Sequence, residues 1–328
     1  MFESRTANLS QCLSHHRHRI PDREAVIDGD RRFTYGEFDD LVSETAAAFL
    51  SLGLEAGEVV GIVDDNSAEH LAQILAANRI GAIPSPINWR LAADELGYIL
   101  RQSGLTVLSV GERFVETARL AAADAPDLRV VVTDAATPPE GWRRWPELLD
   151  EHRGAEVADV PAGLDDLQRI LYTSGTTSRP KGVMLTHGNV LFNTLGQIVE
   201  LELSARDRIM ISAPLFHVSG GDVPGFSALY VGATLVIAQS YQASDIVELI
   251  ERERVSGLIL AAQILNGILQ LDMSDRDLTE LRFIVFGGIA PPIYQRLQEH
   301  LPHVWLVEAY GMTELCNGGA YLDAAHVP

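Results

Sequence analysis

Residues 172–187 read YTSGTTSRPKGVMLTH, and this stretch decides how the rest of the chain is interpreted. It joins an apolar strand expected at residues 169–173 to another expected at residues 183–186. Glycine permits positive φ, so successive backbone N–H groups in such a turn can converge on an anion, and the hydroxyl side chains add donors. Lys181 adds a positive point charge. The pattern predicts a loop that binds phosphate.

Two other interpretations of this loop have to be weighed. A surface loop rich in Ser, Thr and Gly without any ligand has the same composition, and composition alone leaves both alternatives open. The loop of a P-loop ATPase is disfavoured, because Pro180 precedes the lysine and Gly182 follows it where Ser or Thr is required.

On both sides of this loop, short β-branched runs alternate with helical periodicity. A hairpin is expected over residues 25–34, a helix from the Thr34–Glu37 capping box to Leu50, and a helix capped by Ser67 that ends at Arg79. Residues 134–165, rich in Pro, Gly and acidic side chains, interrupt the alternation and are expected to cross the surface. The alternation predicts an α/β fold of parallel sheets with helices on both faces. Further strands are expected at residues 59–63, 80–86, 107–110, 129–133, 208–212, 234–238, 258–261, 283–286 and 304–307.

Composition excludes several functions. The chain has 328 residues, 47% of them hydrophobic, which is ample for a core. Its 25 Lys and Arg against 45 Asp and Glu give a net charge of −20. Such a charge repels nucleic acid and anionic membranes, so no nucleic-acid partner is expected. Cys12 and Cys316 are too few for a disulfide framework or a zinc quartet, which favours a cytoplasmic protein.

Targeting and membrane segments are not expected from the sequence. No apolar run follows the N-terminus as a signal peptide requires. The most apolar stretch, residues 256–271, is interrupted by Gln263 and Asn266 and predicts a buried strand followed by a helix rather than a membrane span. The run at residues 15–19, HHRHR, is either a metal-binding tract or, as favoured, the solvated end of an amphipathic helix.

A second motif, EAYGMTE at residues 308–314, follows an expected strand. With residues 172–187 it resembles the signature segments of the adenylate-forming superfamily, which contains acyl- and aryl-CoA synthetases, luciferases and peptide-synthetase adenylation domains. Ser178 departs from the glycine that the family usually has there. Weaker matches are PLFH at residues 214–217, GGIAP at residues 287–291 and NWR at residues 88–90, the last favouring a CoA ligase for fatty or aromatic acids.

The resemblance implies a role for each matched residue. Tyr310 would stack on adenine, Thr313 would contact the α-phosphate, and His217 would line the acyl pocket near the reacting carboxylate. Lys181 would hold the leaving phosphates, and Thr176 and Glu314 would hold Mg²⁺. The catalytic set is therefore Lys181, Thr313, Glu314 and His217, and the nucleotide would be bound by Thr173, Ser174, Gly175, Thr176, Thr177, Lys181, Gly288, Ile289, Ala290, Glu308, Ala309, Tyr310, Gly311, Met312 and Thr313.

The resemblance also implies an architecture and a reaction. The chain would correspond to most of the large domain of an acyl-CoA synthetase, an α/β fold with two interleaved, helix-covered, mainly parallel sheets. One subdomain would hold residues 1–54 with 204–328, the other residues 55–203. The reaction is the activation of a carboxylic acid by ATP and Mg²⁺ to an acyl-adenylate, on the way to a thioester with CoA.

The matched segments end before the family's later motifs. The aspartate that holds the ribose and the lysine of the small C-terminal domain have no counterpart in residues 1–328, so poor turnover or none is expected from these residues alone. Two alternatives follow: a binding module that holds ATP or acyl-adenylate and needs a separate chain, and an inactive fragment that retains only the fold.

Overall fold

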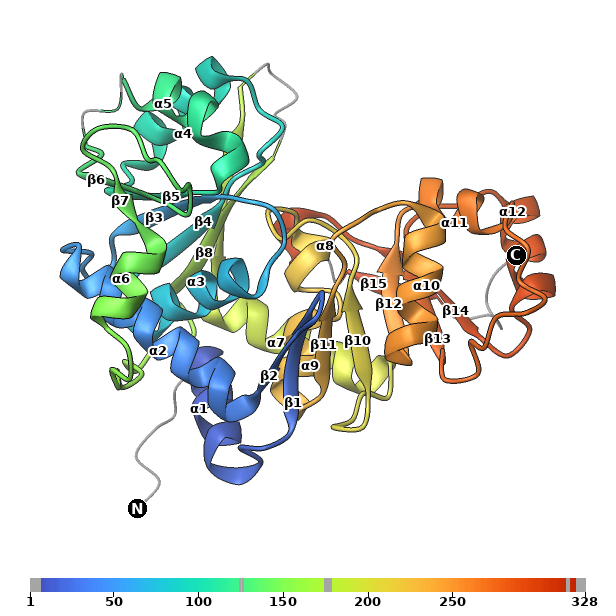
Figure 1. The fold of residues 1–328 in the computed structure, drawn as a ribbon. Helices are drawn as coiled ribbons and strands as arrows, with labels where there is room; N and C mark the ends of the chain where they lie inside the picture. The colour runs from blue at the N-terminus through green and yellow to red at the C-terminus, as the bar shows by residue number, and fades with distance from the viewer. Residues whose placement is uncertain (1–6, 124, 126, 174–178, 317–318, 323–328) are drawn as a thin grey trace. The chain divides into compact units, whose positions relative to one another are not determined.

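Strands and helices alternate along the computed structural model, which describes residues 7–123, 125, 127–173, 179–316 and 319–322 (Figure 1). The chain divides into two units, the first comprising Met1–Pro21 and Tyr35–Val190, the second Asp22–Thr34 and Leu191–Pro328. The subdomain boundaries expected from the resemblance therefore differ from this division. Of residues 1–54, only residues 22–34 group with the C-terminal half, because they form strands of its sheet whereas the helices on either side pack in the first unit.

The first unit is built on a five-stranded sheet in the order β4-β3-β5-β6-β7, with every neighbouring pair parallel. Three of its strands are wholly buried runs of four or five residues, which is the pattern of strands covered on both faces. The strands are β3 (Val59–Val63), β4 (Ile83–Pro86), β5 (Val107–Val110), β6 (Val130–Thr133) and β7 (Arg143–Arg144).

Helices cover both faces of this sheet (Figure 1). On one face, α4 (Ala93–Ser103) and α5 (Val115–Ala122) share an apolar cluster with β3, β5 and β6, and the short η1 (Glu112–Phe114) precedes α5. On the other face lie α2 (Tyr35–Ser51) and α3 (Ala68–Arg79), which contact each other and α1 (Ser10–Arg19). As predicted, Ser67 caps α3, its hydroxyl accepting a hydrogen bond from the His70 amide at 3.0 Å.

Residues 134–165 were expected to be a surface crossing only, and this expectation is incomplete. They contain β7 and a helix, α6 (Trp145–Glu151). This segment folds onto the first unit because Trp145 at the start of α6 is buried. Its indole Nε1 donates to Ser109 Oγ at 2.7 Å, and its ring packs edge-on against Phe49. A proline in the first turn was the sequence signal for this helix.

The strands flanking the predicted phosphate loop form an antiparallel pair of their own. β8 (Leu167–Thr173) pairs with β9 (Lys181–Thr186), and the register sets Thr173 opposite Lys181 at the end of the hairpin from which the loop leaves. Tyr172 of β8 also packs against the apolar cluster beneath α4. Both strands of the prediction are confirmed: β8 begins two residues earlier than expected, away from the loop, and β9 begins two residues earlier, toward the loop.

The second unit contains an eight-stranded sheet in the order β15-β14-β13-β12-β10-β11-β1-β2, parallel except for its two outermost pairs. The predicted hairpin over residues 25–34 forms its β1–β2 edge. The antiparallel β15 at the other edge was not predicted. The strands are β1 (Glu24–Asp28), β2 (Arg31–Thr34), β10 (Arg208–Ile211), β11 (Thr234–Ile237), β12 (Gly257–Leu260), β13 (Phe283–Phe286), β14 (Trp305–Tyr310) and β15 (Ala320–Leu322).

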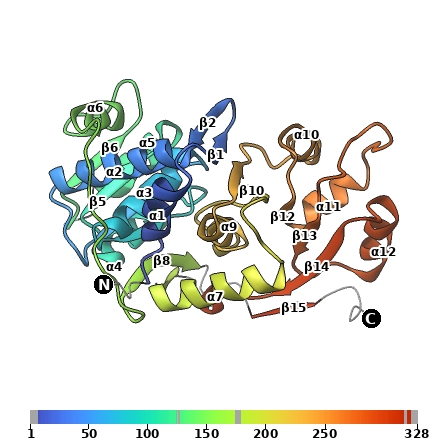
Figure 2. The same ribbon diagram turned by 90° about the horizontal axis from the view of Figure 1, so that it is seen from below.

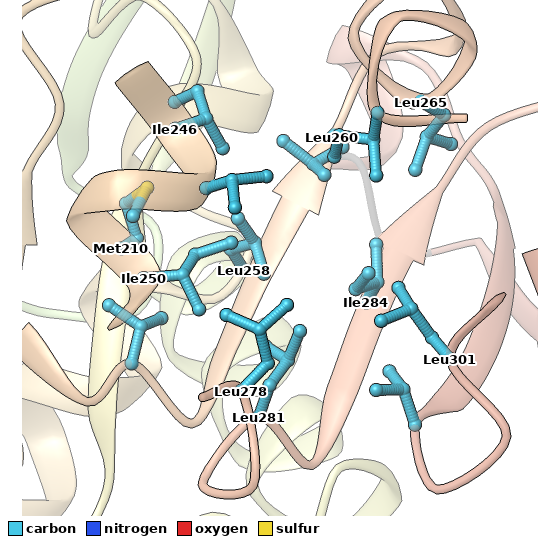
Figure 3. Close-up of a cluster of buried hydrophobic side chains, with 14 of the residues drawn as sticks. Met210, Ile246, Ile250, Leu258, Leu260, Leu265, Leu278, Leu281, Ile284 and Leu301 are labelled. Carbon is cyan, nitrogen blue, oxygen red and sulfur yellow. The ribbon is translucent and has the colours of Figure 1, made fainter. Parts of the chain in front are cut away.

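The main core of the second unit lies between this sheet and three helices (Figure 3). Side chains of α10 (Ala243–Glu253), α11 (Ala262–Ile268) and α12 (Pro291–His300) pack on β10, β12 and β13 in a cluster that includes Met210, Leu258 and Ile284. α9 (Gly225–Val231) packs on β10 and β11 (Figure 2). β12 followed by α11 confirms the strand and helix expected in residues 256–271. The remaining helices are α7 (His187–Glu200), α8 (Val218–Gly221) and η2 (Thr313–Leu315).

The histidine-rich run lies at the end of α1, but it is only partly solvated. His15 and His18 are exposed, whereas His16 is buried with its ring 4.9 Å from that of Tyr35. None of the helices formed by described residues combines the length and the apolar character needed to cross a bilayer.

Candidate functional site

The strand order of the eight-stranded sheet reverses between β10 and β12. From β10 the chain proceeds to β11 on one side, and from β12 to β13 on the other. In open α/β sheets, ligands bind outside the carboxyl ends of the strands at such a reversal. The residues that follow β10, β12, β13 and β14 therefore define the candidate site, because these strands are mutually parallel and end at the same edge.

His217 follows β10 and begins α8. Its ring accepts a hydrogen bond from the Ser219 amide, so it acts as the N-cap of that short helix. The side chain is exposed at the surface, yet partial desolvation lowers the pKa of His217, against an opposing effect of the nearby Asp222 carboxylate. The imidazole is therefore neutral at neutral pH.

Residues 287–290 follow β13 as an exposed turn before α12. Gly288 has φ of +45°, in the left-handed region that side chains other than glycine rarely adopt. Ile289 is half-buried, and Ala290 is exposed at the N-cap of α12. This turn presents backbone rather than side chains at the edge of the sheet.

The 308–314 motif occupies the end of β14 and the turn beyond it. Glu308 and Ala309 are half-buried, whereas Tyr310 has 70% of its side chain exposed, an unusual position for a tyrosine at the end of a strand beside a core. Gly311 and Met312 lead into η2, which carries Thr313 and the exposed Glu314.

Side chains from two other segments hold this turn in place. Asn193 of α7 donates from Nδ2 to the Cys316 carbonyl at 2.9 Å. Cys316 is buried, has φ of +54°, and its thiol lies 3.4 Å from Asp222 Oδ1. Neither Asn193 nor Asp222 was identified from the sequence, because an isolated polar residue gives no signal of a contact with a distant segment.

The predicted phosphate loop lies in the first unit, at the end of the β8–β9 hairpin. Thr173 is half-buried and Lys181 is exposed, and they face each other across the register. The predicted loop residues Ser174, Gly175, Thr176 and Thr177 lie outside the described residues.

Two contacts with α4 anchor the ends of this hairpin, and both were missed in the sequence. The Tyr172 hydroxyl donates to Gln102 Oε1, and Arg179 lies over the ring of Tyr98, 5.3 Å from its centroid. Burial raises the pKa of Tyr172 to about 12, so the phenol remains a donor at neutral pH. A Cβ on Gly182 would lie 3.2 Å from Tyr172 Cζ, so glycine accommodates the Tyr172 ring next to the strand backbone.

The predicted site residues therefore form two groups, each within its own unit. The sheet edge of the second unit brings together His217, Gly288, Ile289, Ala290, Glu308, Ala309, Tyr310, Gly311, Met312, Thr313 and Glu314. The hairpin of the first unit carries Thr173 and Lys181.

The described residues at this edge suit a metal ion that takes few of its ligands from the protein. In the described part of the chain no group of three or more His, Cys, Asp or Glu side chains is arranged as a metal cage. Mg²⁺ usually binds through one or two carboxylates plus phosphate oxygens and water. Glu314 offers one exposed carboxylate that makes no ion pair with any described residue. Thr176 lies outside the described residues.

The fold and the reversal point define a doubly wound α/β protein with a candidate ligand site at the carboxyl edge of its larger sheet. The chain belongs to the AMP-binding enzyme family, whose sequence pattern matches residues 13–327.

Relatives in this family are acid–CoA ligases. The chain is 35% identical over 318 residues to an indoleacetate–CoA ligase of Aromatoleum aromaticum, covering 97% of this chain and 62% of the relative. It is 32% identical over 311 residues to a feruloyl-CoA synthase of Amycolatopsis, covering 94% of this chain and 60% of the relative. The chain thus spans about three fifths of the length of these curated relatives.

A solved structure supports the same assignment. The anthranilate CoA ligase AuaEII in complex with anthranoyl-AMP superposes with a TM-score of 0.92 and 25% identity, covering 98% of this chain and 63% of that one. The α/β fold predicted from the sequence is therefore confirmed as that of the large N-terminal domain of adenylate-forming CoA ligases.

Proposed function

We propose that this chain carries the adenylating part of an AMP-forming acid–CoA ligase. It would activate a carboxylic acid, fatty or aromatic, with ATP to give an acyl-adenylate and pyrophosphate. In the complete reaction the CoA thiol would then attack the activated carbonyl. The observation that carries the proposal is the sheet edge of the second unit, where His217, Gly288 and the 308–314 motif follow neighbouring parallel strands at a reversal of strand order.

The chemistry of that edge suits the first half-reaction. The exposed face of Tyr310 can stack on the adenine ring, and the backbone of the Gly288 turn permits the close approach of a flat base. The Thr313 hydroxyl can donate to an oxygen of the α-phosphate, where negative charge increases as the acid attacks. The reaction is then promoted mainly by positioning and by electrostatic stabilisation.

The hairpin of the first unit carries the residues proposed to bind the phosphates of ATP. Lys181 would neutralise the β- and γ-phosphates, which leave as pyrophosphate, and Thr173 would add a hydroxyl donor. Tyr172 and Arg179, each in contact with α4, would keep the two ends of the loop in register. Ser174, Gly175, Thr176 and Thr177 complete the proposed phosphate-binding set.

Glu314, with Thr176, would hold Mg²⁺, which when bound would screen the charge of the phosphates. ATP, the acid and CoA are the proposed small-molecule partners, in the cytoplasm. An acid with a ring or a long chain is favoured because ligases for indoleacetate, ferulate and long-chain fatty acids are among the relatives.

The proposal is tested by titration calorimetry with a non-hydrolysable mimic of an acyl-adenylate, indoleacetyl sulfamoyl adenosine. Wild-type protein should bind it, and Tyr310→Ala should weaken binding about ten-fold, since base–aromatic stacking contributes about 1–3 kcal/mol. Phe192→Ala is the matched control, because Phe192 is equally an exposed aromatic of the second unit but lies on α7. Its affinity should equal that of wild type.

Pyrophosphate release with indoleacetate, ferulate and palmitate then separates the alternatives. Turnover with any acid supports a ligase. Binding of the mimic without turnover supports the binding module, and the addition of a separate chain that supplies the family's lysine should then restore release. A folded wild type that binds no mimic would leave the inactive fragment as the correct interpretation.

A further inference from the structure

His217 is held by two hydrogen bonds at one ring nitrogen. Its Nδ1 lies 3.2 Å from the Ser219 amide nitrogen and 2.7 Å from the Ser219 hydroxyl oxygen. A backbone amide can only donate, so this bond favours the tautomer in which Nδ1 carries the lone pair. In the neutral ring the proton therefore sits on Nε2, and the Ser219 hydroxyl acts as a second donor to Nδ1.

The backbone around this pair is fixed by close contacts. The His217 amide donates to the Pro214 carbonyl at 2.9 Å, and the Gly220 amide donates to the His217 carbonyl at 2.8 Å. A Cβ on Gly220 would lie only 2.1 Å from the Pro214 carbonyl oxygen, so the turn accepts no side chain there. The orientation of the imidazole is thus set by a rigid turn at the carboxyl end of β10.

This arrangement differs from an ordinary helix cap. Ser, Thr, Asp and Asn are the usual N-cap residues, and their side chains serve the helix alone. Here a titratable ring is the cap, and capping occupies Nδ1. Within the described residues Nε2 makes no hydrogen bond, so one ring nitrogen of defined protonation remains available to a ligand.

We propose that Ser219 is a positioning residue, which holds His217 in the Nε2–H tautomer so that this N–H donates to a carboxylate oxygen of the acid substrate. The inference rests on the proposed function. A neutral donor orients the carboxylate without giving it a proton, which preserves the nucleophilicity of the attacking oxygen. A ring protonated on Nδ1 instead would offer a lone pair, which repels the carboxylate.

The tautomer can be observed directly by NMR. In protein labelled with ¹⁵N at the histidine rings, long-range ¹H–¹⁵N correlation at pH 8 should show His217 as Nε2–H, with His217→Gln to assign the signal. Ser219→Ala loses the hydroxyl and keeps only the longer bond from the amide, so a minor but detectable Nδ1–H tautomer is expected beside Nε2–H. Ser219→Thr should restore the wild-type pattern. Ser244→Ala is the control, because Ser244 is an exposed hydroxyl on α10 of the same unit.

Kinetics supply the second measurement. With the most active acid of the panel, Ser219→Ala should raise KM for the acid about five-fold, the usual effect of one lost hydrogen bond, and leave KM for ATP unchanged. Ser219→Thr should recover most of this loss. If Ser219 only stabilised the fold, Ser219→Ala would change KM for the acid and KM for ATP together.

The outcomes distinguish this inference from the proposed function. An Nδ1–H tautomer in wild type, or an unchanged tautomer and KM in Ser219→Ala, overturns the role of Ser219 while the ligase proposal stands. If wild type binds no adenylate mimic and releases no pyrophosphate, the ligase proposal fails, and with it the carboxylate as the partner of Nε2.

Discussion

Both units contain a parallel sheet whose strand order reverses, and the two reversal points differ in their side chains. In the first unit the reversal lies between β3 and β5, since β3 leads to β4 on one side and β5 leads to β6 on the other. In the second unit it lies between β10 and β12. Topology alone would make each a candidate ligand site.

The reversal point of the first unit is filled by its own residues. Asp64 follows β3, and its Oδ1 accepts from the Asp65 amide at 2.8 Å. The same oxygen would lie 2.1 Å from a Cβ on Gly111, which follows β5, so the carboxyl occupies the space that a side chain would take. Burial, reinforced by the charge of Asp134, raises the pKa of Asp64 to about 7.

The reversal point of the second unit instead leaves its side chains exposed. His217 and Tyr310 are exposed there, and the pKa of His217 is lowered, so this edge offers a neutral donor and an aromatic face. A buried carboxyl that ionises near neutrality would repel phosphate, whereas this edge would not. The residues that follow the strands thus decide whether a reversal point is suited to a phosphate ligand.

The largest effect is expected from Gly220→Ala. Its Cβ would meet the Pro214 carbonyl at 2.1 Å, and a backbone atom cannot move without moving the turn. We expect a loss of about 3 kcal/mol in the free energy of unfolding, the upper end for overpacking. Urea unfolding followed by circular dichroism measures it, and acid-dependent pyrophosphate release should be lost with it.

Gly196→Ala is the matched control for this substitution. Gly196 lies in α7 of the same unit, and a Cβ there would have no neighbour within 4 Å. Alanine should stabilise the helix by about 0.5–1 kcal/mol. Equal unfolding midpoints for the two variants would show that the turn after β10 is not rigid.

Asp64→Asn is expected to raise the free energy of unfolding by an amount that depends on pH. The pKa of Asp64 is about 7 in the folded protein, against an ordinary 3.8, so the folded state retains a proton that the unfolded state releases. Stability is therefore lost as the pH rises from about 4 to 7, and asparagine, which is neutral and of the same shape, removes this loss. The gain should be roughly 2–3 kcal/mol larger at pH 8 than at pH 5.

Urea unfolding at the two pH values tests this expectation. Asp150→Asn serves as the control, because Asp150 of the same unit is exposed and pairs with the exposed Arg153, an interaction of about 1 kcal/mol or less. The interpretation of Asp64 is wrong if the stability gain of Asp64→Asn is the same at pH 5 and pH 8.

Much of the fold could be predicted from the sequence, because its strands are short buried runs and its helices have clear ends. Ser67 before α3 and the run from Val59 to Val63 carry these signals locally. The 308–314 motif could be placed at a strand end for the same reason.

Features that depend on distant partners could not be predicted. The burial of Trp145 requires Ser109 and Phe49, and neither is near it in sequence. The grouping of residues 22–34 with the second unit depends on pairing of β1 with β11, two hundred residues away along the chain. The capping of the Ser219 amide by the His217 ring is local, but a His-x-Ser spacing does not reveal which ring nitrogen accepts.

The smallest effect is expected from Gly111→Ala. Its Cβ would lie 2.1 Å from Asp64 Oδ1, as close as the Cβ of Gly220→Ala would lie to the Pro214 carbonyl oxygen, but here the neighbour is a side chain that can move. The neighbour here is the Asp64 carboxyl, which can rotate away, so the cost at pH 5 should be about 1 kcal/mol. Once displaced toward water, Asp64 ionises more readily, so the cost should fall as the pH rises to 8. In an Asp64→Asn background this pH dependence should disappear, because residues in contact are not additive. A cost that is equal at both pH values would mean that Asp64 stays buried, and the two reversal points would then be equally rigid.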